Sequence, residues 1–456
     1  MFLLLFREII FYKEKQLDMK NRIKQKDKND HLLLTPVVAN KKGEIFDLKG
    51  FGAAAMQGKK PVLLTEKQTI KMSYGSELMM LPGHKPIVFN FDKKKFQVLH
   101  KNPYFPNEDV YPVAIFNSPG YVNRYFCAYE YTNELLPLFS YCAAGWGRGG
   151  FRSAALCVET ETRQDLRFMP IKKVKSGVEI MQKKYPDNRL IRHLERCALE
   201  YGCPAAKNFF IGRYEAPLPT SKTCNADCLG CISFQKENKL IACQERISFT
   251  PSPNEISEVA LEHILKVKKS IVSFGQGCEG DPLTAFNVIK PAIKSIRRKT
   301  PAGTINMNTN AGMPEHLEEL FDLGLDSIRV SMNSVRKSCY TAYHMPKSYV
   351  FSDVIKSIHI AGDKEKFISI NYLNCPGVTD SELEFEALTK FLEELPVKMI
   401  QWRNLNYDPL HYFKTMEKAG GKSQPLGMHY IIKKLKTLFP HIIHGYFNPP
   451  KEDFTK

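Results

Sequence analysis

Between residues 255 and 403 the sequence alternates regularly between helical and extended apolar patterns. Residues 255–269 carry apolar side chains at helical spacing, and Ser270–Phe274 is a short β-branched run that ends at a glycine. The alternation continues with strands expected over 304–308, 327–331, 367–373 and 398–403, and helices over 283–298, 314–323, 350–361 and 380–395. Strands joined by crossover helices pair in parallel, and their carboxyl ends form the functional edge of the sheet. The pattern therefore predicts an α/β fold.

Three of the twelve cysteines, Cys224, Cys228 and Cys231, form a compact CxxxCxxC run. The run follows the apolar stretch Phe209–Gly212, which we interpret as the first of six strands. The other nine cysteines lie apart, as is typical of small buried side chains. Without an export signal, this usage argues against a disulfide framework and for reduced thiols or metal ligands. The intervening Asn, Asp and Gly residues tolerate the tight turns that would point three sulfurs inward.

A set of three thiolates leaves two interpretations of the metal that it binds. A structural zinc ion normally takes four protein ligands, and no fourth Cys or His follows closely in the sequence. A [4Fe-4S] cluster held by three cysteines instead leaves one iron open to a substrate or cofactor. The spacing favours the cluster, and a non-catalytic binding module stabilised by zinc is the alternative.

The CxxxCxxC run, followed by alternating strands and helices, resembles the radical S-adenosylmethionine (radical SAM) superfamily. The resemblance implies a six-stranded partial (β/α)6 barrel over residues 205–405, with Cys224, Cys228 and Cys231 holding a [4Fe-4S] cluster. It also implies that S-adenosylmethionine binds the open iron through its amino and carboxylate groups. Members of this family reductively cleave that cofactor to a 5′-deoxyadenosyl radical, which abstracts hydrogen from a substrate. We therefore expect a radical SAM enzyme whose substrate the sequence does not identify.

The segment Phe274–Leu283 resembles the Gly-Gly-Glu segment with which the family binds the methionine amino group. Glycines let backbone approach a ligand closely, and a carboxylate at the carboxyl end of a strand can accept from an ammonium group. The resemblance implies that Gly277 and Glu279 bind the cofactor. Asp281, two residues later, is the alternative acceptor.

Two further strand ends carry side chains suited to a cofactor. Ser331 and Asn333 resemble the family's ribose or carboxylate motif, and we expect them on one face because they lie two apart in an extended strand. Asn308 and Asn310 are placed in the same way at the end of the preceding strand, where hydrogen bonding within the strand ends is an equally weighted explanation.

One position departs from the family pattern. Many members carry an aromatic residue directly before the third cysteine, against the adenine, and this chain has Gly230 there. Phe234 is a candidate replacement, although an aromatic side chain after a loop more often belongs to the core.

Around the radical SAM core domain at 205–405 we expect three other regions. Residues 1–42 read as a disordered polar, basic tail, and residues 43–204 as a β-rich N-terminal module that ends in helices. Residues 406–456 read as a C-terminal helical extension with an amphipathic helix near 428–438.

The composition of the chain limits the cellular compartments and the binding partners that we expect for the protein. The chain of 456 residues has 43% hydrophobic residues, which excludes extended disorder, and no apolar run approaches the roughly 18 residues that span a bilayer. The opening MFLLLF lacks the flanks of a secretory signal, so we expect a cytoplasmic protein without a membrane partner. The net charge of +17 keeps an anionic partner open. The substrate is a small molecule, a peptide or RNA, and a donor such as flavodoxin or ferredoxin supplies the electron.

Overall fold

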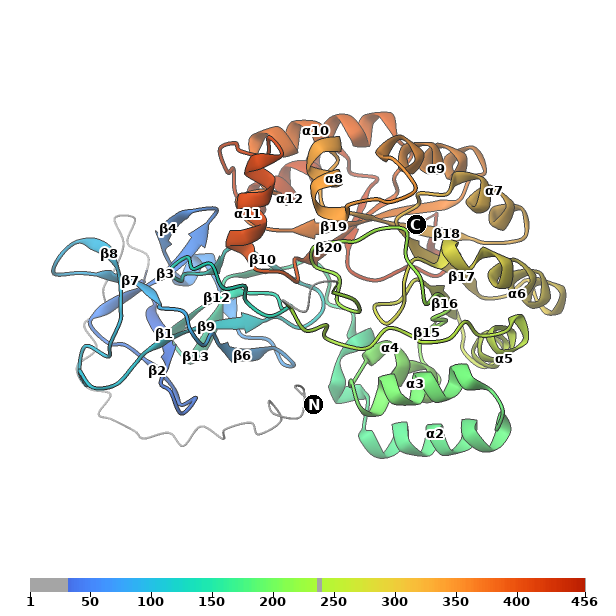
Figure 1. The fold of residues 1–456 in the computed structure, drawn as a ribbon, viewed down its shortest axis with the longest axis horizontal. Helices are drawn as coiled ribbons and strands as arrows, with labels where there is room; N and C mark the ends of the chain where they lie inside the picture. Colours follow the sequence, from blue (N-terminus) through green and yellow to red (C-terminus); the bar gives the residue numbers. More distant parts are fainter. Residues whose placement is uncertain (1–31, 236–239, 456) are drawn as a thin grey trace.

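The computed structural model describes residues 32–235 and 240–455. A β-rich N-terminal region lies beside a mixed α/β region in which a parallel sheet curls inside a set of helices (Figure 1). The expected tail falls mostly on residues 1–31, which lie outside the described residues. Strand β1 (Thr35–Ala39) begins before residue 43, so the N-terminal sheet starts earlier than the sequence pattern suggests.

The N-terminal region is built from antiparallel strands joined by tight turns. Twelve of them form one sheet, and β10 and β14 form a separate pair. After β1 the strands are β2 (Ile45–Asp47), β3 (Phe51–Gln57), β4 (Lys60–Leu63), β5 (Ile70–Lys71), β6 (Glu77–Met80), β7 (Ile87–Asn90), β8 (Lys95–Val98), β9 (Tyr111–Phe116), β10 (Tyr121–Asn123), β11 (Phe126–Cys127), β12 (Cys142–Gly147), β13 (Gly150–Ser153) and β14 (Ala155–Cys157). Side chains from both sides of this sheet form small apolar clusters.

Three helices lead from the N-terminal sheet into the parallel one: α2 (Ile171–Lys184), α3 (Arg189–Leu199) and α4 (Pro204–Phe210). Helix α4 corrects the predicted first strand, because Phe209 and Phe210 close a helix that starts at Pro204. Proline suits the first helical position, and both rings are buried against neighbouring helices, so the apolar pair has helical packing. The first strand of the sheet is β15 (Glu215–Pro217) instead.

The parallel sheet has seven strands in sequence order, one more than the six expected. They are β15, β16 (Ile271–Phe274), β17 (Thr304–Thr309), β18 (Ser327–Met332), β19 (Phe367–Asn374), β20 (Met399–Asn404) and β21 (Ile443–Gly445). The helices are α5 (Pro253–Ile264), α6 (Phe286–Lys299), α7 (Pro314–Asp322), α8 (Lys337–His344), α9 (Phe351–Asp363), α10 (Glu382–Glu394), α11 (Pro409–Lys418) and α12 (Met428–Leu438). The seventh strand lies in the segment that the sequence assigned to a helical extension.

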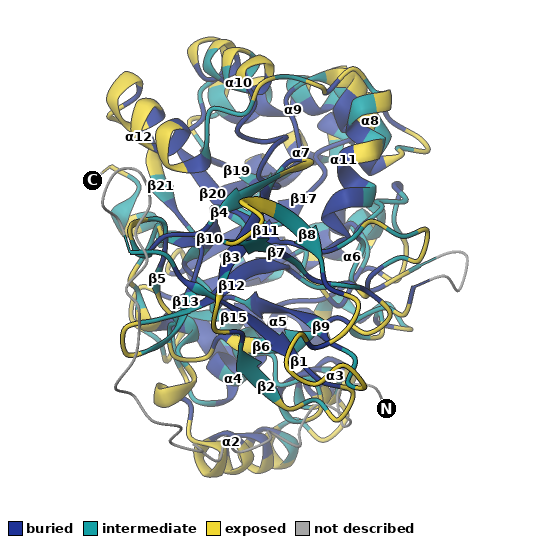
Figure 2. Ribbon diagram, turned by 90° about the vertical axis from the view of Figure 1, so that its left-hand side faces the viewer, coloured by how far each residue is buried: buried dark blue, intermediate teal, exposed yellow. Residues whose placement is uncertain are grey.

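The two faces of the parallel sheet differ in polarity. Alternate residues such as Ile328, Val330 and Met332 belong to the large apolar core that also contains side chains of the surrounding helices. Figure 2 shows this buried interior in dark blue and the exposed outward surfaces of α2 and α12 in yellow. None of the helices in the described part of the chain is both long and apolar enough to cross a membrane.

The N-terminal region contacts the carboxyl ends of β19 and β20. The Asn404 side chain accepts from the amide of Asn123 at 2.7 Å and donates to the carbonyl of Tyr121 at 2.9 Å. The buried Asp408 accepts from the hydroxyl of Tyr129 at 2.8 Å. The carboxyl edge of the sheet carries the loops of a parallel fold, so the N-terminal region borders the place where a ligand would enter.

Candidate functional site

The cysteine loop lies between β15 and α5 and is fastened to the end of helix α8. The amide of Asp227 donates to the carbonyl of His344 at 3.0 Å, and the amide of Leu229 donates to the carbonyl of Tyr343 at 3.0 Å. On the sheet side, the Asn310 side-chain amide donates to the Asn225 side chain at 2.6 Å. These bonds hold the loop at the carboxyl edge of the sheet.

The three cysteines of the loop are half-buried and face different neighbours. The Cys228 sulfur lies 3.3 Å from Nδ1 of His344, and the Cys231 sulfur lies 3.5 Å from a guanidinium nitrogen of Arg246. Burial, reinforced by the Asp281 carboxylate, raises the pKa of Cys224 to about 11. Three thiolates at this place therefore need a strong positive counter-charge such as a metal centre.

The three sulfurs of the loop do not gather as the ligands of a single ion. Thiolates on one tetrahedral zinc ion lie about 3.8 Å apart, as zinc–sulfur bonds of about 2.3 Å require. Among the described residues, the set of three ligand atoms that gathers within 4.8 Å is a different one, outside this loop. The zinc interpretation of the CxxxCxxC loop therefore has no support in the described residues.

The predicted cofactor residue Glu279 is fully engaged within the fold. One carboxylate oxygen accepts the amides of Thr220 and Ser221 at 2.7 and 2.8 Å, and the other accepts those of Gly275 and Gln276 at 2.7 Å each. Burial raises the pKa of Glu279 to about 7, against the lowering effect of these amides. Glu279 thus joins the loop after β15 to the turn after β16.

Asp281 lies in the same turn but is electrostatically coupled to the cysteine loop. Its carboxylate accepts the amides of Leu283 and Asn310 at 3.0 and 2.6 Å, and the hydroxyl of Thr309 at 2.9 Å. Burial raises the pKa of Asp281 to about 6. The Thr309 hydroxyl lies within hydrogen-bond distance of both Asp281 oxygens, at 2.9 and 3.0 Å, so three protein donors engage Asp281 whereas four engage Glu279.

Glycines bring the backbone of this turn close to its neighbours. Gly275 has φ +77°, and a β-carbon there would lie 1.7 Å from the carbonyl oxygen of Asn308. A β-carbon on Gly277 would lie 2.8 Å from Ile232 and 2.9 Å from the side chain of Gln244. The predicted residue Gly277 thus packs against the segment that follows the cysteine loop.

The structure brings some of the remaining predicted residues together and separates others. Asn308 donates to the carbonyl of Gly275 at 3.0 Å, so it and Asn310 border the turn and the cysteine loop. Ser331 lies within β18, which ends at Met332, and Asn333 is the first residue after the strand. Asn333 is fully buried and donates to the hydroxyl of Tyr412, toward α11.

Phe234, the candidate cover for the adenine, is exposed rather than part of the core. Its side chain is 46% accessible, and the guanidinium of Arg246 lies 5.0 Å from the centre of its ring. Arg246 also contacts the Cys231 sulfur, so this one side chain connects the Phe234 ring to the cysteine loop.

Polar side chains line the inner face of the sheet, which the sequence pattern did not reveal. Ser273 donates to the carboxylate of Glu215, and Asn306 donates to the Ser273 hydroxyl at 3.2 Å. The hydroxyl of Ser327 in turn donates to Asn306 at 2.9 Å. The network joins side chains of four neighbouring strands, β15 to β18, and two arginines lie further along on β18 and β20.

Those arginines, Arg329 and Arg403, both donate to the side-chain oxygen of Gln401 at 3.1 Å. Within the described residues neither forms an ion pair with a carboxylate, and Nε of Arg329 has no hydrogen-bond partner. Burial and the nearby Arg403 charge lower the pKa of Arg329 to about 9. In the sequence, the signal for this arginine pair was the presence of charged residues within strands that are otherwise apolar.

Comparison with known proteins places these observations in a family. A family model described as the radical SAM superfamily matches residues 218–388. Methylornithine synthase is 13% identical with a TM-score of 0.37, over 60% of this chain and 75% of that one. The hydrogenase maturase HydG from Carboxydothermus hydrogenoformans is 15% identical with a TM-score of 0.32, over 62% and 76%. Streptococcus suis SuiB, solved with its precursor peptide SuiA, is 11% identical with a TM-score of 0.36, over 57% and 53%. No curated protein matches the chain significantly.

Proposed function

Because residues 218–388 match the family model of the radical SAM superfamily, we propose that the chain is an iron–sulfur enzyme that reductively cleaves S-adenosylmethionine and uses the resulting 5′-deoxyadenosyl radical to abstract hydrogen from a substrate. The observation that carries the proposal is the CxxxCxxC loop, which lies at the carboxyl edge of a parallel sheet within the matched residues. Cys224, Cys228 and Cys231 are the proposed ligands of a [4Fe-4S] cluster. Such a cluster supplies an electron and one open iron when it is bound.

We assign the cofactor's ammonium group to Asp281 in preference to Glu279. Asp281 raises the pKa of both Cys224 and Cys228, so its carboxylate lies close to the cysteine loop. Three protein donors engage this carboxylate, one fewer than engage Glu279. Glu279 instead holds the turn in shape through four backbone amides. The turn and the cysteine loop are also bordered by Gly277, Asn308 and Asn310. Asn333 instead donates a hydrogen bond to Tyr412 of helix α11.

Exclusion of water is the second task of the protein in this chemistry, because a radical in open solvent reacts with stray hydrogen donors. The described N-terminal region contributes by covering the carboxyl ends of β19 and β20. Its Leu138 also packs in one buried apolar cluster with Tyr343 and Tyr407, beside the cysteine loop. A reductant of the flavodoxin or ferredoxin type would supply the electron from outside.

The arginines on the inner face point to an anionic ligand. Two half-buried guanidinium groups lie side by side without a carboxylate partner among the described residues, and a bound anion would neutralise them. The anion is either the carboxylate of S-adenosylmethionine or a carboxylate or phosphate of the substrate. In the first case Arg329→Gln weakens S-adenosylmethionine binding by about ten- to a hundredfold, the value of one charge-assisted hydrogen bond.

In the second case Arg329→Gln leaves S-adenosylmethionine binding unchanged and raises the free energy of unfolding, because an unneutralised, half-buried charge is removed. Arg163→Gln is the matched control and should lower stability, since Arg163 already pairs with Glu161 at 2.8 Å. A loss of stability in Arg329→Gln with unchanged cofactor binding would show that Arg329 is structural and would refute the anion site.

The reaction itself is tested with the full chain after anaerobic reconstitution with iron and sulfide. The protein is incubated with dithionite and S-adenosylmethionine, and 5′-deoxyadenosine is measured by liquid chromatography. We expect the product in wild type and none in Cys228→Ala. A wild-type protein with an intact cluster and no product would contradict the proposal.

A further inference from the structure

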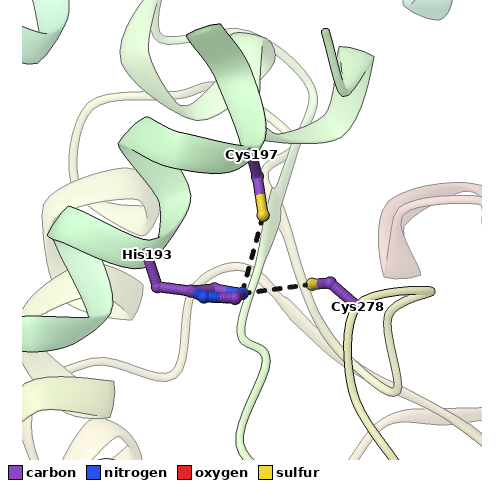
Figure 3. Close-up of side chains that lie close together, drawn as sticks. All are labelled: His193, Cys197 and Cys278. Atoms are coloured by element: carbon purple, nitrogen blue, oxygen red, sulfur yellow. Dashed lines mark hydrogen bonds between the residues drawn. The ribbon is translucent and has the colours of Figure 1, made fainter. Parts of the chain in front are cut away.

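A second group of potential metal ligands lies between helix α3 and the turn after β16. His193 and Cys197 are four residues apart on α3, so they lie on one side of the helix, and Cys278 faces them from the turn (Figure 3). Nε2 of His193 lies 3.4 Å from the Cys278 sulfur and 3.5 Å from the Cys197 sulfur. All three ligand atoms lie within 4.8 Å of one another.

One hydrogen bond at Nε2 of His193 does not account for both of its sulfur contacts. The Nε2 atom of an imidazole has a single in-plane position, either a proton or a lone pair, so it can serve one sulfur well but not two. A metal ion can instead be bound by all three side chains at once, because each ligand atom then directs its own lone pair at the ion. Zinc–sulfur and zinc–nitrogen bonds of about 2.3 and 2.0–2.1 Å at a tetrahedral angle separate sulfur from nitrogen by about 3.5 Å. The two observed separations agree with that value.

The surroundings also suit a bound ion. Cys197 and Cys278 are buried, at 2% and 6% accessibility, while His193 is half-buried and lets an ion approach. The His193 ring packs edge-on against Phe249, with centroids 6.3 Å apart. The amide of Cys203 donates to the carbonyl of Cys197 at 2.9 Å, which places another thiol near the group.

We propose that His193, Cys197 and Cys278 form a binding site for a thiophilic divalent ion of the zinc type, separate from the CxxxCxxC loop. Binding would release the two thiol protons to solvent and leave the fourth position of a tetrahedron to water or to Cys203. No electron transfer is involved.

The position of the site suggests a structural role. Cys278 directly precedes Glu279, whose carboxylate organises the amides of the same turn. An ion at this site would fasten helix α3, which precedes the parallel sheet in sequence, to the turn that carries Asp281. The ion would therefore stabilise the turn, whether or not the chain cleaves S-adenosylmethionine.

The test uses the full chain with Cys224, Cys228 and Cys231 all changed to alanine, so that the other loop cannot bind metal. After anaerobic purification and loading with zinc, unbound metal is removed and zinc is measured by mass spectrometry. We expect about one zinc per chain. Adding His193→Gln or Cys278→Ser should reduce bound zinc at least tenfold, whereas adding Cys157→Ser, which changes an exposed and unrelated thiol, should leave it unchanged.

Cobalt substitution is the second measurement, because a variant can lose metal simply by failing to fold. Cobalt in the site should give thiolate-to-metal charge-transfer absorption, and Cys197→Ser should weaken that absorption while circular dichroism stays native. Less than a tenth of a zinc per folded chain would overturn the proposal. So would zinc retained in both ligand variants, or a Cys197–Cys278 disulfide found by mass spectrometry in the protein as purified.

Discussion

The hydroxyl of Tyr343 lies 2.9 Å from the position that a β-carbon on Gly230 would occupy. The carbonyl oxygen of Asn406 lies 3.2 Å from the same position, so the loop leaves almost no space beside this glycine. This packing explains why the residue before the third cysteine is glycine and not an aromatic side chain. Tyr343 and the loop occupy the volume that a large side chain would need.

Gly230→Ala should therefore displace the cysteine loop and lower the iron bound after reconstitution. The new methyl group would press against the Tyr343 hydroxyl, and Tyr343→Phe removes that hydroxyl. We expect the double variant to recover part of the iron lost in Gly230→Ala, with iron and sulfide per chain as the readout. Equal iron content in wild type and Gly230→Ala would show that the contact does not position the loop.

Each of Cys224→Ala, Cys228→Ala and Cys231→Ala should abolish cluster assembly, because each removes one of the three thiolates proposed to hold the cluster. Iron and acid-labile sulfide should fall to background in all three variants. Cys157→Ala is the control, since Cys157 is exposed on the N-terminal region. Iron lost in the control, or kept in one of the three, would mean that the ligands are misassigned.

Glu279→Gln should weaken the fold more than it weakens cofactor binding. The variant places an amide group against two backbone amides that now donate to a carboxylate oxygen. Loss of charge-assisted hydrogen bonds at about 1.5–3 kcal/mol each predicts a free energy of unfolding lowered by about 3 kcal/mol or more, measured by urea denaturation.

Asp281→Asn is the matched comparison. It should keep the cluster and lower the affinity for S-adenosylmethionine by about ten- to a hundredfold. The opposite pattern, with affinity lost only in Glu279→Gln, would return the ammonium group to Glu279.

The buried His263 should make the protein less stable at mildly acidic pH. Its Nε2 lies 3.2 Å from the carbonyl of Tyr214, and burial lowers the pKa of His263 to about 4 from 6.5. The fold therefore favours the neutral ring, and stability present above pH 6.5 is lost as the pH falls toward 4. Between pH 7.5 and 5.5 this one residue should cost about 1.3 kcal/mol.

The check for His263 is urea unfolding of wild type and His263→Gln at both pH values. Other titrating groups contribute equally to the two proteins, so the difference between them isolates His263. A pH dependence that is identical in both proteins would contradict the prediction.

Periodicity in the sequence was sufficient to predict most of the parallel sheet. Strands β16 to β20 lie where short β-branched runs alternate with helical patterns, because these strands are largely buried whereas each helix buries one stripe. Helix α12 also lies where the amphipathic pattern places it. Local pattern was not sufficient for Phe209–Gly212, where a short apolar run packs as a helix end. It also missed β21, whose three residues carry little signal and pair only because β20 offers an open edge.

The site was predictable to the extent that it is local in sequence. The cysteine run is one such feature, and its radical SAM family is confirmed by the match over 218–388. The different roles of Glu279 and Asp281 depend on hydrogen bonds from backbone amides of other loops. The spacing of residues in the sequence does not reveal these bonds. Asn333 was placed beside Ser331 on the assumption that the strand continues, and the strand ends at Met332. The group of His193, Cys197 and Cys278 brings together residues up to 85 positions apart.

The open iron of a three-cysteine cluster is the central claim, and the electron paramagnetic resonance spectrum of the reduced cluster tests it most directly. The reconstituted full chain is reduced with dithionite, and its spectrum is recorded during a titration with S-adenosylmethionine. Direct binding to the open iron predicts a saturable change in the signal, which should be weaker in Asp281→Asn. An intact reduced cluster whose spectrum does not change at any concentration of S-adenosylmethionine would contradict the account.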